Sequence, residues 1–311
     1  MKDSIGQKAW RNYFERAHKQ HALTHAYLFI GPAQSGKGMF MTWLAGLLLG
    51  SSPLEHPDYV VLSQDEATLV TPIENVRTFM RILELSPIAG EYRVAVIQNL
   101  ERLSVQGYNA LLKTLEEPPR HVILLVAAES LDQLPATVCS RLQICRFRPT
   151  PRAELAKALQ AAGATPPQAD SMAAAAMGRV GAAVGWLHQP SEFARHQAEA
   201  ALFAKLLRQP IGDRFAYTET IAKEAACTRI ELDRLLGHWL IILRDVALTA
   251  SNQPGLVASP YLKADLEVIA RAASMKEWLL TIRSLELARE RIRTYANRRL
   301  TLNTFFLTIP L

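Results

Sequence analysis

Cysteine is scarce in this sequence of 311 residues, which contains only Cys139, Cys145 and Cys227. None of them belongs to a C-x₂-C pair, so the sequence predicts neither a zinc site nor a disulfide framework. Long apolar runs are also missing, because the longest, Met39–Leu49, is well short of the ~20 residues that span a bilayer. The N-terminal stretch MKDSIGQKAW has no apolar signal-peptide core. We therefore expect a cytoplasmic protein without membrane contacts.

The excess of positive charge is modest, with a formal net charge of +6 and a pI near 9.3. This balance fits a neighbour of DNA or of acidic proteins, and it fits an ordinary solvated surface equally well. Hydrophobic residues make up 49% and charged residues 21% of the chain, which is typical of a globular protein with sizeable cores. The length predicts two or three domains.

A glycine-rich loop between a strand and a helix is the first motif with chemical content. The apolar run Ala26–Ile30 predicts a buried strand, and it leads directly into the loop Gly31–Gly38, GPAQSGKG. Such a loop directs backbone N–H groups at a phosphate, and Lys37 adds a positive charge. The last position is Gly38, where Ser or Thr would ligate Mg²⁺. Two interpretations stay open, namely a tight turn without a ligand, or a phosphate or nucleotide site formed by Gly31, Ser35, Gly36, Lys37 and Gly38.

Acidic residues are missing where a nucleotide hydrolase needs them. The run Arg93–Ile97 predicts a buried parallel strand, and the amides Gln98 and Asn99 stand at its exit. A hydrolase places one acid there to hold Mg²⁺ and another to polarise a water. The next predicted strand, His121–Val126, is followed by Ala127-Ala128 instead of a polar side chain. Glu101 is a candidate substitute acid, but its place beyond the strand end argues against it.

The remaining pattern alternates strands and helices up to about residue 147. Further strands are predicted over Asp58–Leu62 and Gln143–Phe147, and a capping box of Thr71 and Glu74 predicts the start of a helix. Alternation of this kind indicates a parallel sheet with right-handed crossovers. After the proline-rich segment Arg148–Pro151, the periodicity is helical throughout.

Several motifs together resemble a known family. The run Asn109–Pro119, NALLKTLEEPP, followed by Ser140-Arg141, is typical of clamp-loader subunits. With the loop Gly31–Lys37, the segment His56-Pro57-Asp58 and the C-terminal NRRL of residues 297–300, it makes the chain resemble the delta-prime subunits of the bacterial DNA polymerase III clamp loader, in the AAA+ superfamily. The resemblance implies an α/β fold, with an AAA+ P-loop domain and a five-stranded parallel sheet in residues 1–149. A small helical lid domain (150–205) and an all-helical collar domain (206–311) would follow.

The resemblance also implies which kind of subunit this is. Motor subunits that hydrolyse ATP carry polar or acidic residues at the positions of Gly38, Gln98-Asn99 and Ala127-Ala128, and an arginine at the position of Gly181. Removal of one contact to a transition state already costs about 10²–10³ in rate. Four replacements therefore predict a stator without intrinsic ATPase activity.

The pair Ser140-Arg141 is retained, and the resemblance implies that Arg141 acts in trans as an arginine finger on the nucleotide of a neighbouring motor subunit. The expected partners are the motor ATPase subunits and the clamp-opening delta subunit of a hetero-pentamer, which reaches the sliding clamp and primed DNA as a complex. No cofactor is expected to be required, and binding of ATP or ADP without hydrolysis stays open. The zinc module of the family has no counterpart in Gly50–Glu55, so no zinc or other metal is expected.

Two other classes of function compete with this interpretation. An active motor-type clamp-loader ATPase, or another P-loop NTPase, is favoured by Gly36-Lys37. A direct DNA-binding protein is favoured by the basic helix predicted over Leu279–Tyr295, although Glu286 and Glu290 interrupt its arginines. Arginines on a helix more often form a solvated or partner-facing surface.

Overall fold

The computed structural model describes residues 6–64, 70–223 and 228–310. The chain divides into two compact units, one of Met1–Gly163 with Gly178–Val184 and the other of Ala164–Met177 with Gly185–Leu311. The boundaries of the lid and collar domains at residues 150 and 206 stay a prediction.

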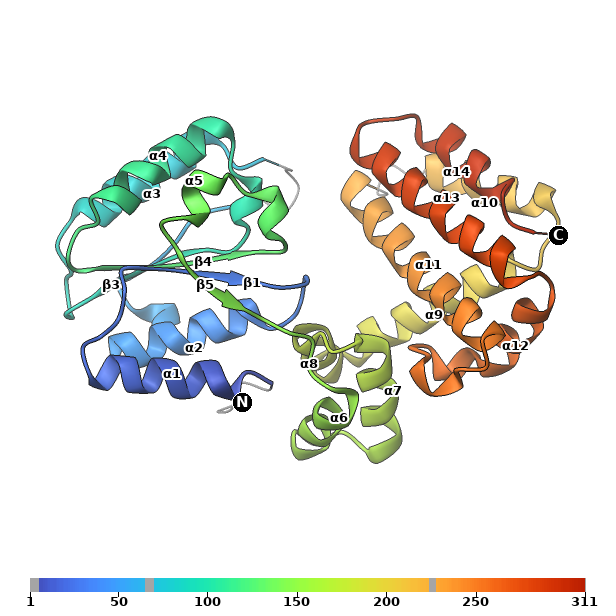
Figure 1. The fold of residues 1–311 in the computed structure, drawn as a ribbon, viewed down its shortest axis with the longest axis horizontal. Coiled ribbons are helices and arrows are strands. Elements are labelled where there is room, and N and C mark those ends of the chain that lie inside the picture. Colours follow the sequence, from blue (N-terminus) through green and yellow to red (C-terminus); the bar gives the residue numbers. More distant parts are fainter. Residues whose placement is uncertain (1–5, 65–69, 224–227, 311) are drawn as a thin grey trace. The chain divides into compact units, whose positions relative to one another are not determined.

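A parallel sheet of five strands forms the centre of the first unit (Figure 1). Its strands follow the order β2-β3-β4-β1-β5, and every pair is parallel. Their bounds are β1 Ala26–Ile30, β2 Tyr59–Val61, β3 Arg93–Ile97, β4 Val122–Ala128 and β5 Gln143–Arg146. All residues of β1, β3 and β4 are buried, as continuous apolar runs in a parallel sheet require.

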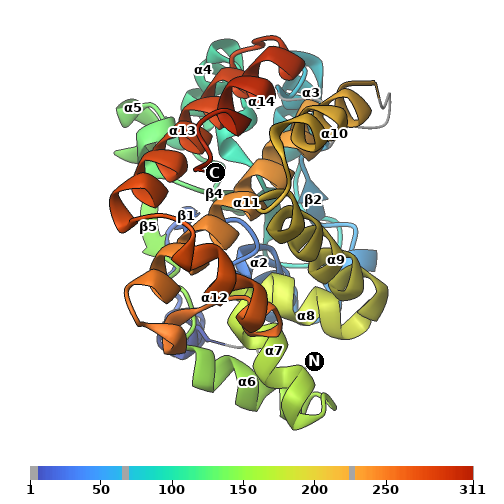
Figure 2. The same ribbon diagram turned by 90° about the vertical axis from the view of Figure 1, so that its right-hand side faces the viewer.

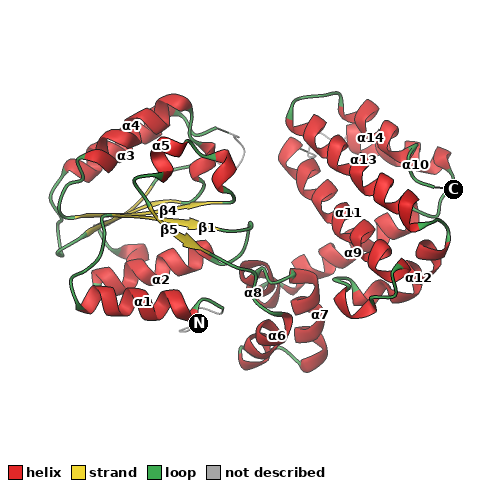
Figure 3. Ribbon diagram, viewed as in Figure 1, coloured by secondary structure: helices red, strands yellow, loops and turns green. Residues whose placement is uncertain are grey.

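Helices cover both faces of this sheet (Figure 3). One layer contains α1 (Lys8–Lys19) and α2 (Lys37–Leu49), and the other contains α3 (Ile73–Glu84), α4 (Val105–Glu116) and the short α5 (Ala136–Cys139). Successive strand residues point to opposite faces, so β1 gives Tyr27 and Phe29 to the core under α1 and α2, and Ala26, Leu28 and Ile30 to the core under α3 and α4. The first unit also includes α6 (Arg152–Ala161).

Every regular element in the described residues of the second unit is a helix (Figure 2). The helix α8 (Val180–His188) begins in the first unit and ends in the second. The other helices of the second unit are α7 (Pro166–Ala176), α9 (Pro190–Leu206), α10 (Ile211–Lys223), α11 (Arg229–Ala250), α12 (Lys263–Arg271), α13 (Met275–Arg293) and α14 (Arg298–Phe306).

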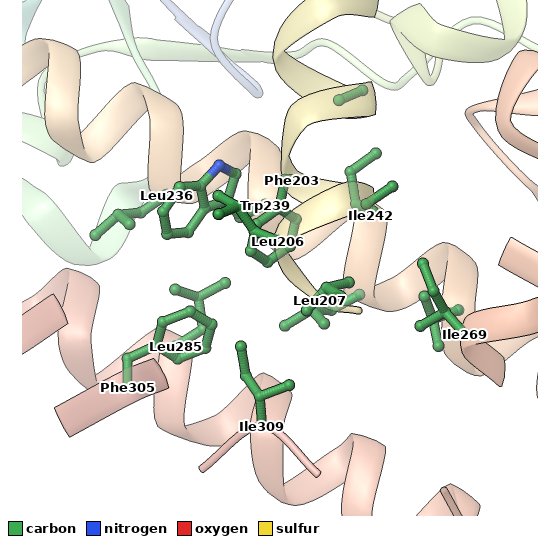
Figure 4. Close-up of a cluster of buried hydrophobic side chains, with 14 of the residues drawn as sticks. Phe203, Leu206, Leu207, Leu236, Trp239, Ile242, Ile269, Leu285, Phe305 and Ile309 are labelled. Carbon is green, nitrogen blue, oxygen red and sulfur yellow. The ribbon is translucent and has the colours of Figure 1, made fainter. Parts of the chain in front are cut away.

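An aromatic cluster fills the core of the second unit (Figure 4). The rings of Phe203 and Trp239 are stacked with their centroids 4.4 Å apart, and Phe305 lies 6.0 Å from Trp239. These residues come from α9, α11 and α14, so the cluster joins three helices that are far apart in sequence. The basic helix α13 is tied to α11, because Arg289 and Arg293 each form an ion pair of 2.8 Å with Asp233.

The predicted α/β class is confirmed, since the structure has a five-stranded parallel sheet with helices between its strands, followed by further helices. Membership of the AAA+ superfamily stays a prediction. The capping box predicted for Thr71 and Glu74 is wrong. The N-cap of α3 is Pro72, Thr71 forms a bridge with Leu103, and Glu74 pairs with Arg77 at 2.7 Å. The helix begins at Ile73, one residue later than a cap at Thr71 requires, and Thr71 pairs with Leu103 instead.

Of the cysteines, Cys139 and Cys145 are free thiols, and burial raises the pKa of Cys145 to about 12. Cys227 lies outside the described residues. Among the helices that the structure describes, none is long and apolar enough to cross a membrane.

Candidate functional site

The glycine loop predicted from the sequence forms a tight turn between β1 and α2. Gln34 has φ 59° and Gly36 has φ 94°, both in the left-handed region, and Gly36 is the N-cap of α2. Glycine tolerates this conformation without strain, whereas it is unusual for glutamine. The turn places Lys37 and Gly38 in the first turn of α2, where the N–H groups of a helix have no partner within the helix. This arrangement suits an anion such as phosphate.

Lys37 is folded into its own loop. Its ammonium donates to the carbonyl oxygens of Gly31 at 2.6 Å and Pro32 at 2.8 Å, and the residue is only 8% exposed. Burial lowers the pKa of Lys37, while the negative charges of Glu129 and Glu101 act in the opposite direction. A phosphate that bound here would therefore compete with the two carbonyls for this ammonium.

Two carboxylates lie within electrostatic reach of Lys37. Glu101 stands in the 3₁₀ turn Leu100–Arg102 after β3, and Glu129 directly follows β4. Burial raises the pKa of Glu101, the charge of Glu129 raises it further, and Lys37 and Arg102 partly offset both effects. One carboxylate oxygen of Glu101, Oε2, is buried without a hydrogen-bond partner in the described structure. Glu101 thus stands beyond the end of β3, as its position in the sequence indicated, and its charge still acts on Lys37.

The exit of β3 is organised by amide hydrogen bonds. The backbone N–H of Asn99 donates to Oε1 of Gln64 at 3.1 Å, and Nε2 of Gln64 donates to the carbonyl of Asn99 at 2.9 Å and to the hydroxyl of Thr71 at 3.0 Å. Gln98 is exposed. Asn99 is therefore held by Gln64 and joins the end of β3 to the segment before α3, in the position where a hydrolase would activate a water.

The first turn of α8 lies against the glycine loop. The N–H of Gly181 donates to the carbonyl oxygen of Gln34 at 2.7 Å, and a Cβ built at Gly181 would stand 2.8 Å from the same oxygen. That distance is too short for any side chain without a shift of backbone. The position at which a motor subunit would carry an arginine is thus closed to side chains in this arrangement.

The site fits a phosphate better than it fits Mg²⁺. Gly38 has open space around it but no oxygen to offer, and Gln98 and Asn99 carry no charge. Over the described residues, no group of three or more His, Cys, Asp or Glu side chains could hold a metal ion. Ser35 is 2% exposed, and its buried hydroxyl has no hydrogen-bond partner in the described part of the chain.

Ser140-Arg141 lies at the C-terminal end of α5, apart in sequence from the glycine loop. The hydroxyl of Ser140 donates to the carbonyl of Thr137 at 3.0 Å, and Nη1 of Arg141 donates to the same carbonyl at 2.9 Å. The second guanidinium nitrogen, Nη2, forms an ion pair of 2.7 Å with Glu116 at the end of α4. Arg141 is thus exposed and held by local contacts.

Gly31, Ser35, Gly36, Lys37 and Gly38 lie in and directly after the turn between β1 and α2, and Ser140-Arg141 lies on another element. Their roles at a phosphate site and as an arginine finger stay predictions. The contributions of Gln64, Glu116 and Glu129 were not predicted from the sequence. Glu129 could have been noticed as a charge directly after a fully buried strand. Gln64 and Glu116 gave no such signal, because their partners are distant in the sequence.

The family match lies within the first unit. Residues 6–151 match the family model "DNA polymerase III, delta subunit". The chain is 31% identical over 153 residues to the DNA polymerase III subunit tau of Escherichia coli, which covers 45% of this chain and 24% of tau. It is 32% identical over 152 residues to the DNA polymerase III subunit delta' of Pseudomonas aeruginosa, with 43% of this chain and 45% of the relative covered. The chain therefore spans less than half the length of these relatives.

Among solved structures, the chain matches in part the Thermotoga maritima RuvB Holliday junction branch migration motor. It has a TM-score of 0.46 and 17% identity, covering 60% of this chain and 62% of that chain. Another is a DNA polymerase III gamma subunit-related protein of the same organism, with a TM-score of 0.43 and 16% identity, covering 90% and 99%.

The sequence relatives are named tau, gamma and delta' alike, so they do not separate a motor subunit from a delta-prime subunit. Together with the family match, they show that residues 6–151 are similar to subunits of DNA polymerase III.

Proposed function

We propose that this chain is a delta-prime-type stator of a bacterial sliding-clamp loader, without ATPase activity of its own. The observation that carries the proposal is the exit of β3, where Gln98 and Asn99 replace acids and Asn99 is hydrogen-bonded to Gln64. An uncharged amide can neither hold Mg²⁺ as a carboxylate does nor accept a proton from an attacking water.

Other features of the nucleotide site support the same proposal. Gly38 offers no hydroxyl to a metal, Ala127 and Ala128 are buried apolar residues at the end of β4, and Gly181 is packed against Gln34. Each of these positions would need a polar or charged group for hydrolysis. A single replacement would weaken catalysis, and their combination leaves no pair of groups to stabilise a transferring phosphoryl group.

Arg141 is the residue through which this chain would contribute to hydrolysis by a neighbouring subunit. Its guanidinium is exposed at the end of α5, and a guanidinium supplied by a neighbour stabilises the charge that develops during phosphoryl transfer. The partners would be the motor ATPase subunits and the clamp-opening delta subunit of a hetero-pentamer in the cytoplasm. The complex would load the sliding clamp onto primed DNA, and the C-terminal helices would belong to its collar.

The glycine loop is proposed to bind the phosphates of ATP or ADP at most weakly and without hydrolysis, and no zinc is required. Binding would have to draw the ammonium of Lys37 away from the carbonyls of Gly31 and Pro32. It would also bring phosphate near the carboxylates of Glu101 and Glu129, which repel it.

The competing function, an active motor-type ATPase or other P-loop NTPase, is favoured by one observation. The charges of Glu101 and Glu129 both act on Lys37. Two acids are therefore near the loop, although Gln98 and Asn99 occupy the positions where a hydrolase carries its acids. A carboxylate with an unpartnered buried oxygen, as in Glu101, could serve as a base.

Measurement of Mg²⁺-dependent ATP hydrolysis separates these functions. The full chain would be assayed alone, and then in a mixture with the motor and delta subunits of its host, the clamp and primed DNA. We expect no turnover by the chain alone and stimulated turnover in the mixture. Arg141→Ala should lower the stimulated rate by about 10³-fold or more per engaged site.

The control is Arg81→Ala, which removes an exposed guanidinium from α3 and should leave stimulation unchanged. Turnover by the isolated chain that disappears in both Lys37→Ala and Glu101→Gln would establish the competing function. Equal stimulation by wild type and Arg141→Ala would remove the arginine finger from the proposal.

A further inference from the structure

The guanidinium of Arg141 does not extend freely into solvent. Nη1 donates to the carbonyl oxygen of Thr137, four residues earlier, at 2.9 Å and to the hydroxyl of Ser140 at 3.3 Å. Nη2 lies 2.7 Å from Oε1 of Glu116. Arg141 therefore caps the last turn of α5 with one nitrogen and binds α4 with the other.

The ion pair with Glu116 is short but open to water. The side chain of Arg141 is 37% exposed and that of Glu116 is 52% exposed. Ion pairs in such surroundings contribute little to stability, because water and salt screen the charges and two long side chains lose freedom. A contact of this kind holds a side chain in one place and can be exchanged at small cost.

The charge of the intended target makes such an exchange favourable. The phosphates of a nucleotide carry several negative charges, and a guanidinium binds two phosphate oxygens at once. Glu116 offers a single carboxylate, which would itself be repelled by an approaching phosphate. The same guanidinium therefore has two competing anionic partners, one in its own chain and one on the neighbour.

We propose that Glu116 is a positioning residue that holds Arg141 in a resting position, and that the arginine finger engages a neighbour's nucleotide by exchanging this ion pair for phosphate. The inference rests on the proposed function of Arg141. Glu116 is the first glutamate of the sequence NALLKTLEEPP, and this proposal gives that glutamate a role.

Removal of the charge of Glu116 should raise the stimulated ATPase activity. If the ion pair with Glu116 has to break before Arg141 reaches the nucleotide, removal of the pair raises the fraction of Arg141 side chains that are free to bind phosphate. The apparent catalytic efficiency of the motor subunits rises with that fraction. Glu116→Gln should therefore raise kcat/KM for ATP of the stimulated motor subunits by about twofold to fivefold, the range that an exposed ion pair allows. The increase should shrink as salt is added, because salt weakens the wild-type pair and has no pair to weaken in the variant.

The matched control is Glu117→Gln, which removes the adjacent exposed carboxylate and leaves the pair of Glu116 and Arg141 in place. This control shows how much of a change in kcat/KM arises only because one negative charge fewer repels the nucleotide. The full complex with clamp and primed DNA would be assayed for each variant over a series of ATP and salt concentrations. Circular dichroism and thermal unfolding would establish that each variant is folded.

The outcomes are distinguishable from a failure of the proposed function. A loss of stimulation in Arg141→Ala, with a salt-sensitive gain in Glu116→Gln and none in Glu117→Gln, supports the inference. A loss in Arg141→Ala with a decrease in Glu116→Gln, or with equal effects of the two glutamine variants, overturns it and leaves the arginine finger intact. No loss in Arg141→Ala overturns both.

Discussion

At the scale of single residues, Asp58 and Arg93 form an ion pair that is almost wholly removed from water. Nη2 of Arg93 lies 3.1 Å from Oδ1 of Asp58, and the two side chains are 3% and 0% exposed. The carboxylate also accepts from the backbone N–H groups of Ile88 and Ala89, both at 2.8 Å. Asp58 thus fixes the segment that connects α3 to β3. The aspartate of His56-Pro57-Asp58 therefore has a structural role.

The substitution Asp58→Asn tests this role. Removal of one charge from a buried, hydrogen-bonded pair leaves the other charge uncompensated, so we expect a loss of about 3–5 kcal/mol in the free energy of unfolding. Chemical denaturation measures this loss. The matched control is Asp170→Asn at an exposed position of α7, which should change the free energy by less than about 0.5 kcal/mol.

Asp58 should also make stability depend on pH. Burial alone would raise its pKa, but the N–H groups of Ala89 and Ile88 and the guanidinium of Arg93 outweigh burial and hold the pKa below its ordinary value. A lowered folded pKa stabilises the protein above the unfolded pKa of about 3.9, and this contribution is lost as the pH falls further through the folded value. Denaturation at a series of pH values below about 4 should therefore show a steeper loss for wild type than for Asp58→Asn. Parallel profiles would contradict this assignment.

At the scale of elements, the contact between α8 and the glycine loop depends on the absence of a side chain at Gly181. Because a Cβ there would lie 2.8 Å from the backbone oxygen of Gln34, Gly181→Ala requires a backbone shift. Overpacking of this kind typically costs about 1–3 kcal/mol. We expect a lower thermal unfolding midpoint and faster hydrogen exchange at the amide of residue 181.

The same helix supplies the control, because nothing lies within 4 Å of a Cβ built at Gly185. Alanine in a helix interior is favoured over glycine by roughly 0.5–1 kcal/mol, so Gly185→Ala should stabilise the protein slightly. If both variants had the same effect, the packing of Gly181 on Gln34 would have no energetic importance.

At the scale of the whole molecule, each compact unit has a core of its own. Leu111 is buried in the core between the sheet and the helices α3 and α4, and Leu236 is buried in the aromatic core of the second unit (Figure 4). Cores built from separate sets of residues need not melt together, so we expect two transitions in calorimetry.

Leu111→Ala and Leu236→Ala should each cost about 2–5 kcal/mol and lower the midpoint of a different transition. Leu280→Ala, at a residue of α13 that is 59% exposed, should move neither transition appreciably. A single transition shifted by both buried substitutions would show that the two units unfold as one.

Much of the first unit follows from local sequence patterns. The apolar runs Ala26–Ile30 and Arg93–Ile97 are found as β1 and β3 with the predicted bounds, and all five residues of each strand are buried, as in the interior of a parallel sheet. The turn at Gly36 was predictable, since this left-handed position is occupied by glycine, whereas the left-handed backbone of Gln34 was not. The replaced acids Gln98 and Asn99 are read directly from the chain.

By itself, the sequence determined the order of strands and helices, the glycine loop and the lack of acids after β3, since each depends on residues that are neighbours in the chain. Only the tertiary structure decided that Thr71 pairs with Leu103 instead of capping α3, that Glu101 and Glu129 both act on Lys37, and that Glu116 holds Arg141. These contacts join residues that are far apart in sequence. Which charged side chains meet depends on how the strands and helices pack, and periodicity along the chain carries no record of that.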